Sequence, residues 1–218
     1  MLLLPGPEHR GEEYDEGIVV GGHRVKIVEE GNQGRGTAWC VWDGSIVLVR
    51  HLEADPDSIG EGLCRIVELG AGTGIAGLCT AVLFPKVHVC LTDVEEALPA
   101  LATNVGMNVE LVGNRVSVEA CDWTSPNDAI VKATWDVVIA SDVVWLEELV
   151  EPFIDTLDRI TETNPRCIIL MSYQSRTRRV DEMLFEGLSG KGFVSRAVPV
   201  VEDLEPPRRK IQLFRIQK

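Results

Sequence analysis

Closely spaced cysteines are absent from this sequence. Its six cysteines lie far apart, mostly within apolar segments, and form no C-x-x-C pair, so we expect no metal site. We interpret them as small buried side chains in a reducing compartment, which points to the cytoplasm, with the nucleus as a further location. They are Cys40, Cys64, Cys79, Cys90, Cys121 and Cys167.

Basic residues are scarce, and long apolar runs are missing. The chain has 21 Lys and Arg residues against 34 Asp and Glu residues, a formal net charge of -13. This balance argues against a nucleic-acid groove, which needs clustered basic side chains. It is compatible with a basic protein substrate, although many proteins are acidic for solubility alone. The run of leucines after Met1 ends at Pro5, and Pro7 follows, so the apolar run is too short for a signal peptide or a membrane span, and we expect neither.

The length and composition indicate one globular domain. The 218 residues are 45% hydrophobic and 25% charged, enough for a sizeable core. Residues 1–16 are polar and contain Pro and Gly, so we predict a flexible N-terminal arm followed by a single domain over residues 17–218. Two apolar segments around Gly21-Gly22 predict a β-hairpin at residues 17–30. We expect the protein to be a monomer.

Strand-like and helix-like segments alternate along the chain. Apolar runs predict strands at 66–69, 87–92, 116–120, 135–140 and 167–171. Helical spacing predicts helices at 42–52, 75–83, 95–108, 147–163 and 178–188. This alternation indicates an α/β fold, with a Rossmann-like, mostly parallel sheet covered by helices on both faces. The last two strands are predicted at 193–200 and 211–216. Because no helix separates them, we predict that they form a C-terminal antiparallel pair, which completes a sheet of seven strands.

The stretch R-I-V-E-L-G-A-G-T-G-I-A-G, residues 65–77, organises the rest of the chain. A short apolar strand runs through glycines into an apolar helix, which leaves free backbone N–H groups beside a ligand. In one frame, Gly72-x-Gly74-x-x-Gly77 matches the dinucleotide fingerprint. Asp93, about 20 residues further on, would then bind a ribose.

A second frame of the same stretch begins at Glu68. The pattern Glu68-x-Gly70-x-Gly72-x-Gly74 resembles the first motif of seven-stranded S-adenosylmethionine methyltransferases. A carboxylate at the strand tip opposes a pyrophosphate but suits a cofactor with an ammonium group and a sulfonium. Glu68 therefore favours the second frame, in which Glu68, Gly70, Ala71, Gly72 and Gly74 bind the cofactor. The simplest alternative is a glycine-rich turn that binds nothing.

Polar and aromatic side chains also follow the other predicted strands. Because ligands of such sheets bind past the carboxyl ends of the strands, we expect these side chains to cluster. Asp93 is placed to accept hydrogen bonds from ribose hydroxyls, and it can also cap the next helix. Trp123 is placed to cover an adenine ring, with core packing as the alternative. Ser141 can place its backbone beside the cofactor.

Asp142 and Trp145 are the candidate catalytic residues. An amine nucleophile must lose its proton and direct a lone pair at the sulfonium methyl group. A carboxylate such as Asp142 can draw in and orient a lysine ammonium, and an aromatic ring such as Trp145 can pack on its stem. The structural alternatives are that Asp142 caps the approach to the next helix and that Trp145 fills the core.

Five segments together resemble one family. In chain order they are W-C-V-W-D-G-S-I-V-L (39–48), V-E-L-G-A-G-T-G (67–74), L-T-D (91–93), C-D-W (121–123) and A-S-D-V-V-W-L-E-E (140–148). They look like the methyltransferase-like family 21 of protein-lysine methyltransferases, which are class I S-adenosylmethionine-dependent enzymes. The resemblance covers residues 36–218.

The resemblance implies roles for particular residues. Asp142 and Trp145 correspond to the D-x-x-Y motif of the family, with Trp145 where Tyr or Phe is usual. The family modifies lysines on chaperones, AAA ATPases and translation factors, which implies a protein substrate of this kind. The residues implied to contact the cofactor are Trp42, Gly70 to Gly72, Asp93, Trp123 and Ser141.

The sequence therefore predicts an enzyme, a protein-lysine N-methyltransferase. It would use S-adenosylmethionine and release S-adenosylhomocysteine, mainly by positioning the amine in line with the methyl group. Three alternatives stay open at this point. They are a non-catalytic adaptor with a methyltransferase fold, a small-molecule amine methyltransferase, and an NAD-dependent oxidoreductase.

Overall fold

The computed structural model describes residues 17–29, 37–60, 62, 64–200 and 211–218. The predicted N-terminal arm, residues 1–16, lies outside the described residues, as does Glu30 at the end of the predicted hairpin. Within the described part, no helix is both long and apolar enough to cross a membrane.

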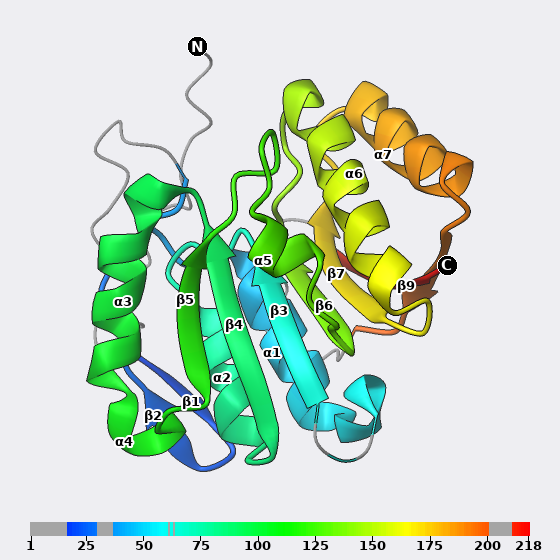
Figure 1. Cartoon of the computed structure of the whole chain (residues 1–218). Helices are drawn as coiled ribbons and strands as arrows, with labels where there is room; N and C mark the ends of the chain where they lie inside the picture. The colour runs from blue at the N-terminus through cyan, green and yellow to red at the C-terminus, as the bar shows by residue number, and fades with distance from the viewer. Residues whose placement is uncertain (1–16, 30–36, 61, 63, 201–210) are drawn as a thin grey trace.

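Within these residues, a seven-stranded sheet forms the centre of the molecule (Figure 1). The strand order is β5-β4-β3-β6-β7-β9-β8; β9 is antiparallel to both of its neighbours, and the other neighbouring pairs are parallel. The prediction of a mostly parallel sheet that ends in an antiparallel pair is confirmed. The strands are β3 (Cys64–Leu69), β4 (Val87–Asp93), β5 (Val116–Ala120), β6 (Val137–Ser141), β7 (Ile168–Gln174), β8 (Val194–Val198) and β9 (Ile211–Gln217).

Helices cover both faces of this sheet (Figure 1). One face carries α1 (Asp43–Ala54), α2 (Ile75–Leu83), α3 (Leu98–Met107) and the antiparallel hairpin of β1 (Ile18–Val20) and β2 (His23–Val25). The other face carries α5 (Asp128–Val131), α6 (Glu147–Thr163) and α7 (Arg178–Gly190). The short helix α4 (Val109–Val112) follows α3, and 3₁₀ turns lie at Pro56–Ile59 and Glu95–Ala97.

The central strand β3 is buried on both faces, and its side chains alternate between two apolar cores. Ile66 belongs to the core beneath α1 and α2, whereas Val67 and Leu69 belong to the core beneath α6 and α7. Glu68 has the parity of Ile66, so its side chain points to the α2 face.

Several element boundaries differ from the predicted ones, and two of these differences bear on the pocket. The predicted helix at 42–52 begins at Asp43, and Trp42 precedes it as an extended N-cap residue with φ −96° and ψ 146°. The predicted strand at 167–171 continues to Gln174, because residues beyond Met171 pair with β9. Both differences place side chains at the edge of the sheet where the pocket lies.

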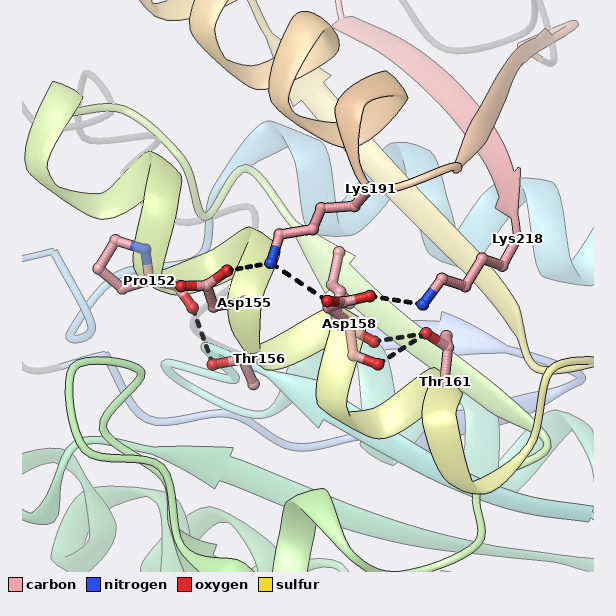
Figure 2. A network of polar contacts seen from close by, with 8 residues as sticks. Pro152, Asp155, Thr156, Asp158, Thr161, Lys191 and Lys218 are labelled. Carbon is pink, nitrogen blue, oxygen red and sulfur yellow. Dashed lines mark hydrogen bonds and ion pairs between the residues drawn. The ribbon is translucent and has the colours of Figure 1, made fainter.

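Acidic side chains on α6 hold two basic residues from later in the chain (Figure 2). Lys191 Nζ lies 2.9 Å from Asp155 Oδ1 and 3.2 Å from Asp158 Oδ2, and Lys218 Nζ lies 2.5 Å from Asp158 Oδ1. Burial favours a higher pKa for Asp158, but the hydrogen bonds from Lys218 and Lys191 outweigh it, so the pKa is lowered. Asp158 therefore ties α6 to the end of α7 and to the end of β9.

We predict that Asp158→Asn lowers the melting temperature by about 2–4 °C at pH 7 and low salt, because the amide keeps the shape but not the charge. A lowered pKa gives stability that is present above the ordinary aspartate pKa and is lost as the pH falls through the folded-state value. The difference from the native protein should therefore shrink toward pH 3. Thermal unfolding followed by circular dichroism checks this, with the exposed Glu162→Gln on the same helix as control. Identical melting curves at pH 7 would contradict the prediction.

Candidate active site

A pocket of about 310 Å³ lies at the carboxyl ends of the central strands. There β3 and β6 are neighbours, and the chain leaves toward β4 and β5 on one side and toward β7 on the other. Open parallel sheets bind ligands at such switch points, and the volume lies within the usual range of ligand pockets. The predicted site residues in its wall are Trp42, Gly70, Ala71, Gly72, Asp93, Trp123, Ser141, Asp142 and Trp145.

The glycine loop after β3 contributes backbone to the pocket wall. Gly70 has a left-handed φ of 68°, and a Cβ there would lie 2.8 Å from Val143 Cγ1, so no side chain fits. Gly74 is instead the N-cap of α2, where a Cβ would lie 2.5 Å from Leu101 Cδ1. Gly74 is therefore a packing residue of the α2 end, and the structure does not bring it to the wall.

Asp93 joins the glycine loop to the end of β4. Its two carboxylate oxygens accept hydrogen bonds from Gly72 N at 2.7 Å and from Val94 N at 2.8 Å. Burial raises the pKa of this carboxyl, and the two backbone hydrogen bonds oppose the rise. Since a carboxylate has about four acceptor sites, lone pairs remain for a ligand in the pocket.

Glu68 lies outside the wall of this pocket. It is 1% exposed, and its Oε2 accepts a hydrogen bond from Gly77 N of α2 at 2.8 Å. Burial raises the pKa of this carboxyl to about 8, against the opposing hydrogen bond from Gly77. The side chain is therefore mostly neutral at pH 7. The structure does not place a negative charge on Glu68 beside a ligand, which is what the choice between the two glycine frames assumed.

Two tryptophans form aromatic parts of the wall. Trp123 follows β5 and packs against Phe153 of α6, with ring centroids 5.1 Å apart and planes tilted by 58°. Trp42 precedes α1, and its indole Nε1 donates to Thr37 O at 2.8 Å. Both rings are thus held by contacts with neighbouring residues while they line the pocket.

The residues after β6 also line the pocket. Among the described residues, Asp142 is the one non-glycine residue with a positive φ, at 55°, a conformation that aspartate tolerates better than most side chains. Asp142 N donates to Ser172 O of β7 at 2.9 Å. Gly44 of α1 packs so closely that a Cβ there would lie 2.9 Å from Asp142 Cβ. These contacts fix Asp142 in the same wall as Ser141 and Trp145.

Arg176 is a wall residue that the sequence pattern does not single out. Its Nη2 donates to Asp142 Oδ2 at 2.5 Å, in an ion pair whose side chains are 10% and 2% exposed. The guanidinium carbon lies 5.7 Å from the ring centroid of Trp42. The negative charge of Asp142 is therefore balanced by a buried cation.

The rule that locates the other site residues also applies to Arg176. The predicted strand ends at Met171, five residues before Arg176, whereas the observed strand ends at Gln174, two residues before it, which places Arg176 at the carboxyl edge of β7. Other parts of the wall follow no strand, so this rule cannot find them. They come from the segment before α1, from α1 itself and from α6, and are Thr37, Ala38, Trp39, Cys40, Ser45, Leu149 and Pro152.

Solved structures that share this fold include methyltransferases. The methyltransferase domain of bacterial CtHen1-CN matches with a TM-score of 0.59 at 13% identity, covering 80% of this chain and 97% of that chain. The CurJ carbon methyltransferase matches with a TM-score of 0.56 at 16% identity, covering 80% of this chain and 53% of that chain. At these identities the likeness shows the fold alone, which is the class I methyltransferase fold.

Sequence comparison identifies the family. A family model described as lysine methyltransferase matches residues 21–191. The protein N-lysine methyltransferase METTL21A of Danio rerio is 31% identical over 166 residues, 75% of this chain and 72% of that protein. The EEF1A lysine methyltransferase 3 of Xenopus tropicalis is 29% identical over 185 residues, 84% of this chain and 79% of that protein. The chain therefore belongs to the lysine methyltransferase family.

Family membership confirms the predicted activity, which is S-adenosylmethionine-dependent methyl transfer to a lysine of a protein. The oxidoreductase and adaptor alternatives are thereby set aside. Over the described residues, no group of three or more His, Cys, Asp or Glu side chains is arranged to hold a metal ion.

We predict that Glu68→Gln leaves the affinity for S-adenosylhomocysteine within about two-fold and changes stability in a pH-dependent way. A raised folded-state pKa gives stability that is complete below the ordinary value of 4.5 and is lost as the pH rises through about 8. The variant has no such loss, so its melting temperature relative to the native protein should rise from pH 5 to pH 9 by about 3 °C or more. Calorimetry and thermal unfolding check this. If the melting temperatures of the two proteins change in parallel with pH, or if the variant loses much of its affinity for S-adenosylhomocysteine, Glu68 is not the buried group with a raised pKa that we describe.

Proposed function

We propose that this pocket binds S-adenosylmethionine and that the lysine enters at Asp142 and Trp145. The observation that carries the proposal is that side chains following β4, β5 and β6 meet the glycine loop of β3 in one wall. The wall suits such a ligand, because Trp123 Nε1 and Ser141 Oγ are buried polar atoms without a hydrogen-bond partner among the described residues. Orphaned groups of this kind are expected where a ligand or water completes the site.

Each part of the wall has a role in holding the cofactor. Asp93 accepts hydrogen bonds from the ribose hydroxyls, and Trp123, held against Phe153, covers the adenine ring. The backbone from Gly70 to Gly72 lets the ligand approach closely, with Ala71 between the two glycines. Ser141 and Trp42 line the part of the pocket nearer to the transfer end.

When bound, S-adenosylmethionine supplies a methyl carbon that leaves sulfur as it bonds to the lysine nitrogen, so that sulfur keeps the electron pair of the broken bond and becomes a neutral thioether. Asp142 orients the lysine nitrogen from its fixed place after β6. Trp145 packs along the lysine stem, and its larger ring narrows the entrance compared with Tyr or Phe. Positioning of this kind is the main contribution that the chain makes to the rate.

We propose that the substrate lysine lies in a chaperone, an AAA ATPase or a translation factor. The relative named EEF1A lysine methyltransferase 3 supports a translation factor. The net charge of -13 supports a basic surface around the target lysine. We further propose a monomer that acts in the cytoplasm or the nucleus. Free, buried thiols support a reducing compartment, and they are Cys64, Cys79, Cys90, Cys121 and Cys167.

We predict that Asp93→Asn and Asp142→Asn separate binding from transfer. Asp93→Asn should weaken S-adenosylhomocysteine binding about ten-fold or more, because an amide cannot accept from two backbone N–H groups and also serve the ribose as a carboxylate does. Asp142→Asn should keep that affinity within about three-fold and lose about 100-fold or more of the transfer rate. Isothermal titration calorimetry and tritiated methyl incorporation measure the two effects. The exposed Asp57→Asn is the control, and equal loss of both properties in Asp142→Asn would contradict its role.

Incubation with tritiated S-adenosylmethionine and a cell extract tests the acceptor class. We predict label in acid-precipitable protein, with mass spectrometry locating it on lysine side chains, because the transfer end is built for an amine on a long apolar stem. Label confined to the acid-soluble fraction would favour a small-molecule amine as the acceptor. Absence of label from both fractions would contradict the proposed function.

A further inference from the structure

The cation beside Asp142 is held in place by the fold. Asp181 of α7 accepts hydrogen bonds from Tyr173 Oη at 2.7 Å and from Ser175 Oγ at 2.6 Å, which fixes the chain just before Arg176. Thr177, just after it, caps α7 by accepting from Val180 N at 3.2 Å. The backbone is anchored on both sides of Arg176, so its guanidinium reaches Asp142 without relying on a flexible loop.

The charges around this ion pair are otherwise mainly negative. Among the described residues of the wall, acidic side chains outnumber basic ones: Asp93, Glu96, Asp122 and Asp142 against Arg176. The elements packed around the pair add the carboxyl groups of Asp43 of α1, of Asp181 of α7, and of Glu147 of α6, which is paired with Arg179. The titratable group that β7 adds is the Tyr173 phenol, which donates its proton to Asp181 in a hydrogen bond and adds no charge. Without Arg176, an amine that enters at Asp142 would meet a carboxylate whose charge is not balanced.

A carboxylate with an unbalanced charge is a poor environment for this reaction. Only the neutral amine has the lone pair that attacks a methyl group, and a lysine amine has an ordinary pKa of about 10.4. Nearby negative charges stabilise the ammonium form and raise that pKa further, whereas a nearby cation lowers it. A guanidinium keeps its charge at all pH values at which proteins stay folded, so it can supply this cation permanently.

We propose that Arg176 is a positioning residue of the transfer site, which fixes the Asp142 carboxylate and uses its permanent charge to favour the unprotonated amine of the incoming lysine. The proposal rests on the proposed function, since it takes the lysine to enter at Asp142. The lysine proton passes to water before transfer. Asp142 then orients a neutral amine, and the ion pair as a whole presents no net negative charge that would hold an ammonium.

Two other roles for Arg176 make different predictions. If the ion pair serves the fold alone, its loss lowers the rate by the same factor at every pH. If the guanidinium occupies the place of the substrate ammonium and must be displaced, its removal raises the rate. The pH profile therefore distinguishes the three roles.

The experiment compares native protein, Arg176→Gln, Arg176→Lys and the control Arg178→Gln. Arg178 is an exposed α7 residue paired with Glu182, so its variant removes the same charge outside the pocket. Each protein is incubated with tritiated S-adenosylmethionine and a concentrated cell extract from pH 6 to pH 10. At extract concentrations where the initial rate on the most strongly labelled protein band no longer rises, that rate is proportional to kcat, whose pH profile reports the groups of the enzyme–substrate complex.

For Arg176→Gln we expect the acid limb of the profile to move about one unit to higher pH, because one nearby cation is lost. The rate then falls about ten-fold on the acid limb, and the two rates converge only at a pH above the pKa that the bound amine has in the variant. Arg176→Lys should keep the limb of the native protein, since it keeps the charge, and Arg178→Gln should match the native protein throughout. Melting temperature and S-adenosylhomocysteine affinity check that each variant is folded.

An unshifted limb in Arg176→Gln, with the rate lowered equally at every pH or raised, overturns the proposal while the proposed function stands. If Arg176→Gln does not fold, the test rests on Arg176→Lys. An acid limb at the same pH as in the native protein supports the role of charge, and an acid limb at a different pH overturns it. If the native protein labels no protein band, the proposed function fails, and the role of Arg176 fails with it.

Discussion

The candidate site depends on two aspartates that hold the carboxyl edge of the sheet together. Asp93 binds the backbone N–H groups of Gly72 and Val94, which couples the glycine loop after β3 to the end of β4. Asp142 binds β7 through its own N–H group and binds Arg176 through its carboxylate. The pocket lies between these two anchors. Both ends are therefore built on rigid strand ends, which suits a reaction whose catalysis is mainly geometric.

Most of the fold and much of the candidate site can be predicted from local segments of the sequence, each considered separately. Apolar runs and glycines locate the strands, and the carboxyl-edge rule then gathers Asp93, Trp123 and Asp142 without any tertiary information. Glu68 shows where this reasoning ends. Because β3 is buried on both faces, its sequence has no apolar–polar alternation that tells which face each side chain takes. Only the packing of β3 against α2 decides that the Glu68 carboxyl turns away from the pocket.

Arg176 could not be predicted as a site residue from the sequence, for a different reason. The end of β7 depends on its pairing with β9, a long-range contact that the local apolar run does not contain. Its partner Asp142 lies 34 residues earlier in the chain, and no pattern connects the two. The ion pair changes the interpretation of Asp142, which becomes one half of a neutral, buried pair. Under the proposed role of Arg176, a single carboxylate would attract an ammonium, whereas this pair would suit the neutral amine that methyl transfer requires.

The central claim is that the cofactor lies along the wall formed by the glycine loop and Asp93, with Glu68 buried behind it. A crystal structure of the protein with S-adenosylhomocysteine tests this most directly. The ribose hydroxyls should lie within hydrogen-bond distance of the Asp93 carboxylate, and no ligand atom should contact the Glu68 side chain. A ligand bound against Glu68, or an empty pocket at saturating S-adenosylhomocysteine, would contradict the claim.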